Sequence, residues 1–445
     1  MTSTIPQAGN VAGISQEEWA TQFAAQAGPA TRMGPFESVH VFWLAGMSCD
    51  GCSIAVTGAT NPPVEKLLLG QVPAVPRLIL YHPVLSVEAG SDFVRHYREA
   101  AEGKLDAPYV IILEGSVSDE RRSGEGYWSA MGAGGLDEEE DESRNIDGVR
   151  QPIRTMDWVT KLAPGAAASI AIGTCATWGG IPAAAGNVTG AMSLMDHLGR
   201  DYRSALGLPV INIPGCSPVG DNFTETVAAV LLFLQGIGPL PEFDELGRPA
   251  WLFSETVHRN CNRAGYYEEG VFAKEYGDRE CLVELGCWGP VVQCNITSRG
   301  AINHMGGCMN TGAPCIGCTM PGFPDKFSPF YATPPGSTVS SNTSRTTGRV
   351  IRALRKFSQR NLNREPRWDW EHVEQPISGW NHGLEAPTAG DKFVHFFYDK
   401  MQFYKGHKPA PGLNDPITHQ REKSKKGDIS GSKPHIEATD RTEGR

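Results

Sequence analysis

The sequence predicts an α/β fold in which helices cover both faces of a parallel sheet. Five short apolar stretches are each long enough for one strand, and helical segments at 92–102 and 156–162 lie between some of them. Continuous apolar strands that alternate with helices are typical of parallel sheets buried on both sides. The predicted strands span residues 39–45, 77–81, 109–113, 169–172 and 210–213.

A chain of 445 residues should divide into about two or three domains. Residues 1–38 form a polar N-terminal extension, and 39–244 carry the α/β pattern. Residues 245–330 are rich in Gly, Cys and Pro, which predicts loops held together by metal centres more than by a large core. A C-terminal extension follows at 331–445, and its charged tail after residue 405 is predicted to be disordered.

Composition excludes some classes of function. The net charge of −10 argues against general nucleic-acid binding, which depends on a basic surface. The longest apolar run, 227–234, is shorter than the roughly 18 residues of a membrane helix and predicts a buried helix. With no export signal recognised, we expect a cytoplasmic protein. Grouped cysteines in that reducing compartment indicate metal or redox chemistry.

All eleven cysteines fall into three sets of four metal-binding side chains. The sets are the first (Cys49, Cys52, Cys175, Cys216), the second (His258, Cys261, Cys281, Cys287) and the third (Cys294, Cys308, Cys315, Cys318). Each cysteine of the first set lies just past the end of a predicted strand. Ligands of open parallel sheets bind at that edge, so the four thiols should converge there. Sets of four thiolates are what iron–sulfur clusters need.

Other interpretations of the three sets exist. The first set could be buried structural thiols, because a cysteine without a partner packs as a small hydrophobe, but the Cys49-x2-Cys52 pair weakens that interpretation. The spacing of the second set fits a structural Cys₃His zinc site as well as an iron–sulfur cluster. The third set could likewise be a Cys₄ zinc site. A relay of clusters is the more economical explanation of sets that are adjacent in the chain.

Six motifs in order resemble the small, electron-transferring subunit of [NiFe] hydrogenases. They are CDGC at 49–52, GTCATWGG at 173–180, PGCSP at 214–218, HRNC at 258–261, CLVELGCWGP at 281–290 and PCIGCTMPGFP at 314–324. The resemblance covers residues 39–330. It implies a flavodoxin-like domain that bears the cluster proximal to the active site, followed by a loop-rich domain with the medial and distal clusters. The nickel–iron centre would belong to a large subunit outside this chain.

The resemblance also implies a role for each set. The first set matches the ligands of the proximal [4Fe–4S] cluster and the second those of the distal [4Fe–4S] cluster. Within the third set, Cys294, Cys315 and Cys318 match the ligands of the medial cluster. The common form of the family has proline where this chain has Cys308, and its medial centre holds three irons. A fourth thiolate at Cys308 should admit a fourth iron, so we expect a medial [4Fe–4S] cluster, or [3Fe–4S] if Cys308 does not ligate.

The surroundings of Cys49 depart from the family pattern. Many relatives have Glu where this chain has Ser48, and a neutral residue where it has Asp50. Asp50 is either a solvated turn residue or a ligand or tuning residue of the proximal cluster. Gly51 occupies a position where membrane-bound, oxygen-tolerant relatives carry an extra cysteine, so that route to oxygen tolerance is not expected. The whole resembles the soluble actinobacterial-type high-affinity uptake hydrogenases.

These features predict a chain that relays electrons from H₂ oxidation at a large-subunit NiFe centre, through three clusters, to an acceptor. No catalytic residue is expected in this chain. The large subunit would form an obligate heterodimer, within a higher oligomer, against residues 49–53 and 216–222. The acceptor would be a redox protein or a quinone-linked chain. The basic stretch 344–362 admits peripheral association with a membrane surface, or packing against a neighbouring subunit.

Two rival functions are considered. The related quinone-reducing subunit of respiratory complexes also transfers electrons, but it does not account for the second and third sets. The other rival is a zinc-stabilised scaffold or interaction protein without redox activity. Iron far above zinc, with a colour bleached by dithionite, would exclude the scaffold.

Overall fold

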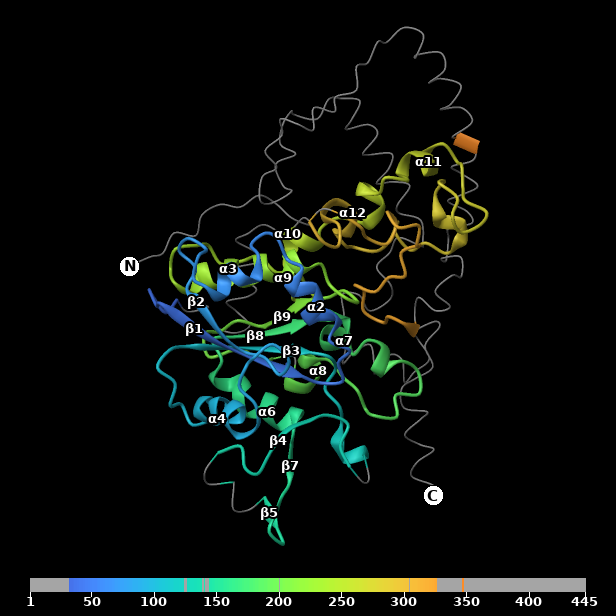
Figure 1. Cartoon of the computed structure of the whole chain (residues 1–445). Helices are drawn as coiled ribbons and strands as arrows, with labels where there is room; N and C mark the ends of the chain where they lie inside the picture. The colour runs from blue at the N-terminus through green and yellow to red at the C-terminus, as the bar shows by residue number, and fades with distance from the viewer. Residues whose placement is uncertain are drawn as a thin grey trace, which may run out of the picture. The chain divides into compact units, whose positions relative to one another are not determined.

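The computed structural model describes residues 32–325, with gaps at 124–125, 138–139, 141–143, 200 and 304, together with 346–347 (Figure 1). These residues form two compact units. Of the described residues, the first contains 32–254 and 318–325, and the second contains 255–317 and 346–347. Residues 1–31, nearly all of the basic stretch 344–362 and the C-terminal tail lie outside the described residues, so the expectations for them stay predictions.

A five-stranded parallel sheet forms the centre of the first unit, which confirms the predicted sheet. The strand order is β2-β1-β3-β8-β9. The first strand, β1, is next to the edge strand β2, and the later strands β3, β8 and β9 follow one another on the other side of β1. The direction of winding therefore reverses between β1 and β3. The strands are β1 (Ser38–Ala45), β2 (Arg77–Tyr81), β3 (Tyr109–Glu114), β8 (Ala168–Ile172) and β9 (Val210–Ile213).

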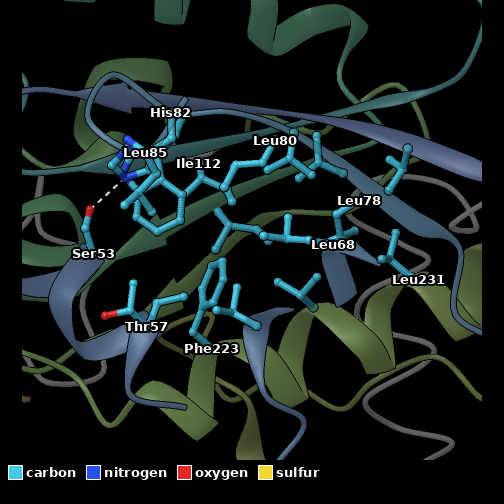
Figure 2. A pocket seen from close by; sticks show the side chains of 18 of the residues that line it. Ser53, Thr57, Leu68, Leu78, Leu80, His82, Leu85, Ile112, Phe223 and Leu231 are labelled. Carbon is cyan, nitrogen blue, oxygen red and sulfur yellow. Dashed lines mark hydrogen bonds between the residues drawn. The ribbon is translucent and has the colours of Figure 1, made fainter. Parts of the chain in front are cut away.

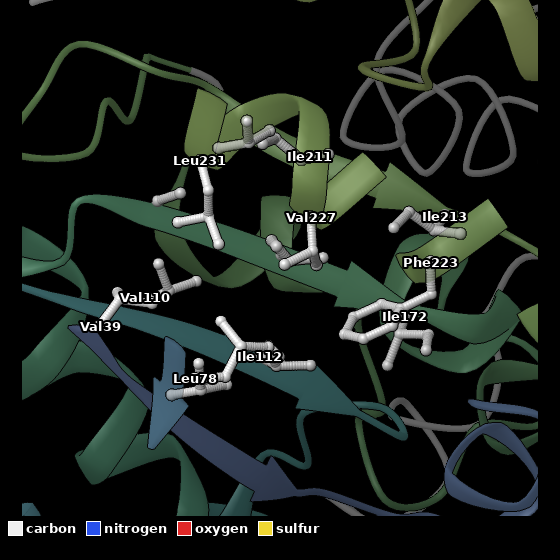
Figure 3. Close-up of a cluster of buried hydrophobic side chains, with 14 of the residues drawn as sticks. Val39, Leu78, Val110, Ile112, Ile172, Ile211, Ile213, Phe223, Val227 and Leu231 are labelled. Atoms are coloured by element: carbon white, nitrogen blue, oxygen red, sulfur yellow. The ribbon is translucent and has the colours of Figure 1, made fainter. Parts of the chain in front are cut away.

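Alternate residues of β1 face opposite sides of the sheet, as the period of a strand requires. Val39, Val41 and Trp43 pack against the helices α2 (Gly51–Thr57), α3 (Val64–Leu68) and α9 (Gly220–Leu234) in one hydrophobic core. Figure 3 shows part of this core, with Val227 and Leu231 of α9 above the strands. The buried helix predicted at 227–234 is therefore confirmed as the second half of α9.

Phe42 and Leu44 face the other side of the sheet, where α4 (Gly90–Ala101) and α6 (Thr155–Leu162) complete a second core. Trp158 of α6 and Tyr97 of α4 are fully buried there. The Tyr97 hydroxyl donates to the carbonyls of Trp43 and Tyr81, which ties α4 to two strands. The two helices confirm the helical segments predicted between the strands, and the two cores show that the sheet is covered on both faces.

Smaller elements complete the first unit. They are α7 (Gly173–Trp178), α8 (Leu194–Leu198), α10 (Ala250–Phe253), the antiparallel pairs β4 (Ala130–Ala133) with β7 (Pro152–Arg154) and β5 (Asn145–Ile146) with β6 (Val149–Arg150), and the 3₁₀ turns Glu120–Arg122, Ala163–Gly165 and Ile181–Ala183. In Figure 1, α2 and α7 lie at the end of the sheet to which the strands point. That end is the carboxyl edge.

The second unit consists largely of loops and single turns. Tyr267, Phe272, Cys281 and Val283 form a small hydrophobic cluster in it. Its regular elements are the 3₁₀ turns Val257–Asn260 and Leu282–Leu285 and the helices α11 (Ala264–Glu268) and α12 (Ile296–Arg299). In the described part of the chain, no helix has the length and apolar character needed to cross a membrane.

Candidate metal centres

The carboxyl edge of the sheet positions all four cysteines of the first set. Cys49 and Cys52 lie between the end of β1 and the first turn of α2. Cys175 lies in α7, which begins directly after β8, and Cys216 lies three residues beyond the last residue of β9. Parallel strands bring their carboxyl ends to one edge, so four thiols that are up to 167 positions apart in the sequence meet there, from Cys49 to Cys216.

Glycines let the backbone approach these sulfurs closely. A Cβ atom on Gly173, whose φ is +82°, would overlap the sulfur of Cys52. A Cβ on Gly180 would lie 2.8 Å from the sulfur of Cys175. Any larger residue at these positions would occupy the space around the thiols. This steric requirement explains why both positions are glycine.

Thr174 ties together the turns that carry the first set. Its backbone N–H donates to the Gly215 carbonyl over 3.0 Å, and the N–H of Gly215 donates back to the Thr174 hydroxyl oxygen over 3.1 Å. The Thr174 hydroxyl in turn donates to the Cys318 carbonyl over 2.5 Å. The indole N–H of Trp178 donates to the neighbouring Thr319 carbonyl over 3.1 Å. Residues 318–319 are therefore fastened to α7, the helix of Cys175.

A buried carboxylate, Glu114, lies behind Cys52 at the end of β3. It accepts hydrogen bonds from the N–H groups of Cys52 (3.0 Å) and Ser53 (3.3 Å). It also accepts from the Ser53 hydroxyl and from the indole N–H of Trp43. Each partner is a donor, which is the pattern of an ionised carboxylate. Glu114 therefore places a negative charge beside the first set and fixes the backbone of Cys52.

His82 extends this network. Its Nδ1 accepts from the backbone N–H groups of Val84 and Leu85, at 3.0 and 3.2 Å. Its Nε2 therefore carries the proton and donates to the Ser53 hydroxyl over 2.8 Å. Burial lowers the pKa of His82, although Glu114 and Asp50 act in the opposite direction. The sequence analysis did not identify Glu114, Ser53 or His82. The one signal in the sequence was Glu114 itself, a carboxylate at the end of the apolar strand β3.

Burial, and after it the neighbouring negative charges, raise the pKa values of Cys52, Cys175 and Cys216 in the first set. Burial raises the pKa of Cys52 far above that of an ordinary thiol, and Glu114 and the other three thiols raise it further. Burial and the neighbouring Cys216 raise the pKa of Cys175 to about 11. Four thiolates can coexist in such a place only with positive charge between them, because each destabilises the others. Iron bound by thiolate sulfur provides that charge, so the donor set fits an iron–sulfur cluster.

Asp50 lies in the turn between the two cysteines of the CDGC motif. Its backbone is left-handed, with φ 59°, and its N–H donates to the Ser48 hydroxyl over 3.0 Å. Asp50 occupies the N-cap position of α2, but its carboxylate makes no capping hydrogen bond. Aspartate tolerates the left-handed region better than most residues, so the turn alone could explain its presence.

The second set surrounds one small cavity in the second unit. His258, Cys261, Cys281 and Cys287 all line it, together with apolar side chains that include Val257 and Met309. His258 is buried, and the edge of its ring meets Tyr267 with centroids 4.6 Å apart. The four side chains predicted from spacing therefore face a common space.

Backbone donors support the sulfurs of the second set. The N–H of Cys315 donates to the sulfur of Cys287 over 3.2 Å, and that of Arg263 donates to the sulfur of Cys261 over 3.4 Å. Burial raises the pKa of Cys281 to about 12 and that of Cys287 to about 11. The N–H···S hydrogen bonds and the positive charge of Arg263 stabilise the thiolate forms. They therefore lower the pKa values that burial raises.

The third set is divided between the two units. Cys294, Cys308 and Cys315 belong to the second unit, and Cys318 begins the segment that belongs to the first. Cys308 lies close enough to Cys287 for its charge to raise the pKa of that thiol. All eleven cysteines are thiols and none forms a disulfide. Among the described residues, no three His, Cys, Asp or Glu side chains are arranged around a single metal ion.

Comparison with known proteins identifies the family. The family model for the C-terminal region of the NiFe/NiFeSe hydrogenase small subunit matches residues 253–331, and the model for the 20 kDa subunit of NADH ubiquinone oxidoreductase matches residues 49–230. The small subunit of the periplasmic [NiFeSe] hydrogenase from Desulfomicrobium baculatum is 32% identical over 293 residues, which are 65% of this chain and 86% of that protein. The chain belongs to the family of [NiFe] hydrogenase small subunits.

Two further relatives support this assignment to the hydrogenase small subunits. The hydrogenase-2 small chain of Escherichia coli K12 is 35% identical over 289 residues, 63% of this chain and 67% of that one. The solved structure of the actinobacterial-type NiFe-hydrogenase from Ralstonia eutropha H16 is 46% identical, with a TM-score of 0.68, and the match covers 79% of this chain and 98% of that chain. A hydrogenase small subunit acts with a large subunit, so this chain is one part of a hydrogenase.

The match to the respiratory 20 kDa subunit does not extend to the second unit. It ends at residue 230, whereas the hydrogenase model begins at 253 and includes the second and third sets. The respiratory 20 kDa subunit therefore resembles this chain only in the domain that carries the first set. Of the two family models, that of the hydrogenase small subunit is the one that includes the second and third sets.

Proposed function

We propose that this small subunit holds three [4Fe–4S] clusters and relays electrons between the NiFe centre of its large subunit and an acceptor. The first set would hold the proximal cluster, the third the medial cluster and the second the distal cluster. The observation that carries the proposal is the convergence of Cys49, Cys52, Cys175 and Cys216 at the carboxyl edge. Each bound cluster supplies a one-electron couple whose potential depends on charge, hydrogen bonds and exposure.

The first set faces outward, which suits transfer to a neighbouring subunit. Cys49 and Cys216 are exposed, and the side chain of Ile54 in α2 is 69% exposed beside them. The two exposed thiols leave this edge of the sheet accessible to a partner. We therefore propose residues 49–53 and 216–222 as part of an obligate interface with the large subunit. The acceptor would be a redox protein or a quinone-linked chain.

The domain limits and the cellular location belong to the same proposal. The proximal cluster would lie in a flavodoxin-like domain at 39–244, and the medial and distal clusters in a loop-rich domain at 245–330. Extensions at 1–38 and 331–445 would flank them. The complex would act in the cytoplasm, with or without attachment to a membrane surface through residues 344–362.

The iron and acid-labile sulfide content of the purified complex tests the proposal. After the metals of the large subunit are subtracted, we expect about twelve irons and as many sulfides per small subunit, four for each set. Reduction with dithionite should bleach the visible absorption, because electrons enter the iron–sulfide charge-transfer system. Zinc in place of iron in the second and third sets would instead support the scaffold function.

We also propose that Thr174 couples the proximal and medial clusters electronically. Thr174 precedes Cys175 in the chain, and its hydroxyl bonds the carbonyl of Cys318, a proposed medial ligand. The same oxygen accepts from the N–H of Gly215, the residue before Cys216. One side chain therefore joins segments that carry ligands of both clusters through two hydrogen bonds. Thr174 would be a positioning residue, since its hydroxyl bonds backbone groups of Cys318 and Gly215 rather than a sulfur.

Thr174→Val should weaken this coupling, because valine keeps the shape but loses both hydrogen bonds. We expect a smaller magnetic interaction between the reduced proximal and medial clusters in EPR, and severalfold slower electron transfer between them. The unpaired buried groups should also cost about 1–3 kcal/mol of stability.

Thr174→Ser keeps the hydroxyl and should restore the coupling. Thr177→Val is the matched control, because the Thr177 hydroxyl donates to the Thr174 carbonyl within the same helix and, among the described residues, bridges to no cysteine-bearing segment. A loss of coupling in Thr177→Val equal to that in Thr174→Val would assign the effect to the helix rather than to the bridge.

For Asp50, we propose a tuning role at the proximal cluster. Asn keeps the left-handed turn but removes the negative charge, so Asp50→Asn should raise the reduction potential of that cluster while all of its iron is retained. A redox titration followed by EPR measures the shift. Loss of iron in Asp50→Asn would show that the carboxylate is a ligand, and an unchanged potential would leave Asp50 with a turn function alone.

A further inference from the structure

A cavity of about 230 Å³ lies in the first unit, between one face of the sheet and the helices α2, α3 and α9. Figure 2 shows Leu80 and Ile112 from the strands on one side of it and Phe223 and Leu231 from α9 on the other. None of the eleven cysteines lines it, so it is not part of a ligand set.

The wall of this cavity offers no hydrogen-bonding group to a ligand. Its side chains with polar atoms are Trp43, Ser53, Thr57 and His82, and each already has a partner; the Trp43 indole N–H donates to Glu114 over 3.0 Å. Ser53 and His82 bond each other over 2.8 Å, as the dashed line in Figure 2 shows, and the Thr57 hydroxyl donates to the Ile54 carbonyl over 2.8 Å. A water molecule needs two to four polar partners to remain in a cavity. We therefore expect the space to be dry.

Access to the cavity is open on one side. Leu85, in the loop after β2, is 51% exposed, and Thr57, at the end of α2, is also exposed. Leu68 and Leu80 are only partly buried, although they point toward the core, because they border this opening. The opposite wall, which includes Val41 and Ile112, is fully buried. A small solute can therefore enter without unfolding of the sheet.

We propose that this cavity is a binding site for one small non-polar molecule, of the size of benzene or smaller, including dissolved non-polar gases. A dry apolar cavity of about 150 Å³ already binds benzene or xenon in another protein, because a void leaves its lining atoms without dispersion partners. The present cavity is larger, and most of its lining is likewise aliphatic or aromatic. A ligand with polar groups would lose its hydrogen bonds to water and find none here, so the site selects against such molecules.

Xenon is the probe that tests the site. Crystals of the whole hydrogenase complex, pressurised with xenon, should show xenon density between Leu80 and Val227. The same density should disappear in Leu80→Phe, whose ring fills the space. Leu206→Phe is the matched control, because Leu206 packs against the same core without lining the cavity, and it should keep the xenon.

Val227→Leu is a milder second variant, in case Leu80→Phe does not fold. It adds only one methylene to the cavity wall. It should reduce xenon occupancy while the thermal stability stays equal or rises, because added carbon fills a void. Three results would overturn the proposal: no xenon in the wild-type cavity, ordered waters within it, or a side chain of the large subunit or of another segment of this chain already occupying it.

Discussion

Replacement of Cys308 by alanine should convert the medial cluster from four irons to three. One of the four thiolates of the third set is lost, and the iron that it held has no other protein ligand, so it should dissociate. The iron content of the small subunit should fall from about twelve to about eleven. The oxidised protein should then show the EPR signal of a three-iron cluster, which is absent from a fully loaded [4Fe–4S] relay.

Two comparisons make this test decisive. Cys308→Ser offers an oxygen ligand at the same place and should retain part of the fourth iron. Cys308 also lies near Cys287 of the second set, so the EPR spectrum of the distal cluster must be followed in the same samples. If Cys308→Ala keeps about twelve irons and shows no three-iron signal, Cys308 is a bystander and the medial cluster has a different fourth ligand.

Gly173→Ala should prevent assembly of the proximal cluster. Its Cβ would overlap the sulfur of Cys52, and its φ of +82° is unfavourable for alanine. Backbone strain costs about 1–3 kcal/mol, and forced overlap in a packed site costs a similar amount. Displacement of the Cys52 sulfur should remove the four irons of the first set while those of the other two sets remain. Metal analysis and EPR of the purified complex measure this loss.

Gly186→Ala is the matched control for this substitution. Gly186 also has a positive φ, +102°, but a Cβ there meets nothing within 4 Å. It therefore reproduces the backbone strain without the contact with sulfur. Equal loss of iron in both variants would mean that strain, rather than the space around Cys52, explains Gly173.

Much of the first unit could be predicted from local patterns. The five apolar stretches became the five strands with shifts of one residue or none at each end, and 227–234 became the second half of α9. Apolar periodicity predicts such elements because burial on both faces leaves few polar positions in a strand. The small elements between β3 and β8, such as β4 and β7, were not predicted, because short exposed strands have no comparable pattern.

The ligand sets were also apparent in the sequence, since cysteine spacing and strand ends are local features. The structure places the first set at one edge and lines one cavity with the second. Our sequence reasoning could not find the partners that support them. Glu114 and Cys52 are 62 positions apart, and Thr174 and Cys318 are 144 positions apart.

The sequence by itself determined which residues form strands, which side chains can bind metal and to which family the chain belongs. Only the tertiary structure decided that Glu114 lies behind Cys52, that Thr174 bonds the Cys318 carbonyl, and that an apolar cavity remains beneath α9. The physical reason is that buried hydrogen bonds and packing depend on which segments meet in space. Strand order and helix placement determine which segments come into contact, and no local sequence pattern specifies these long-range contacts.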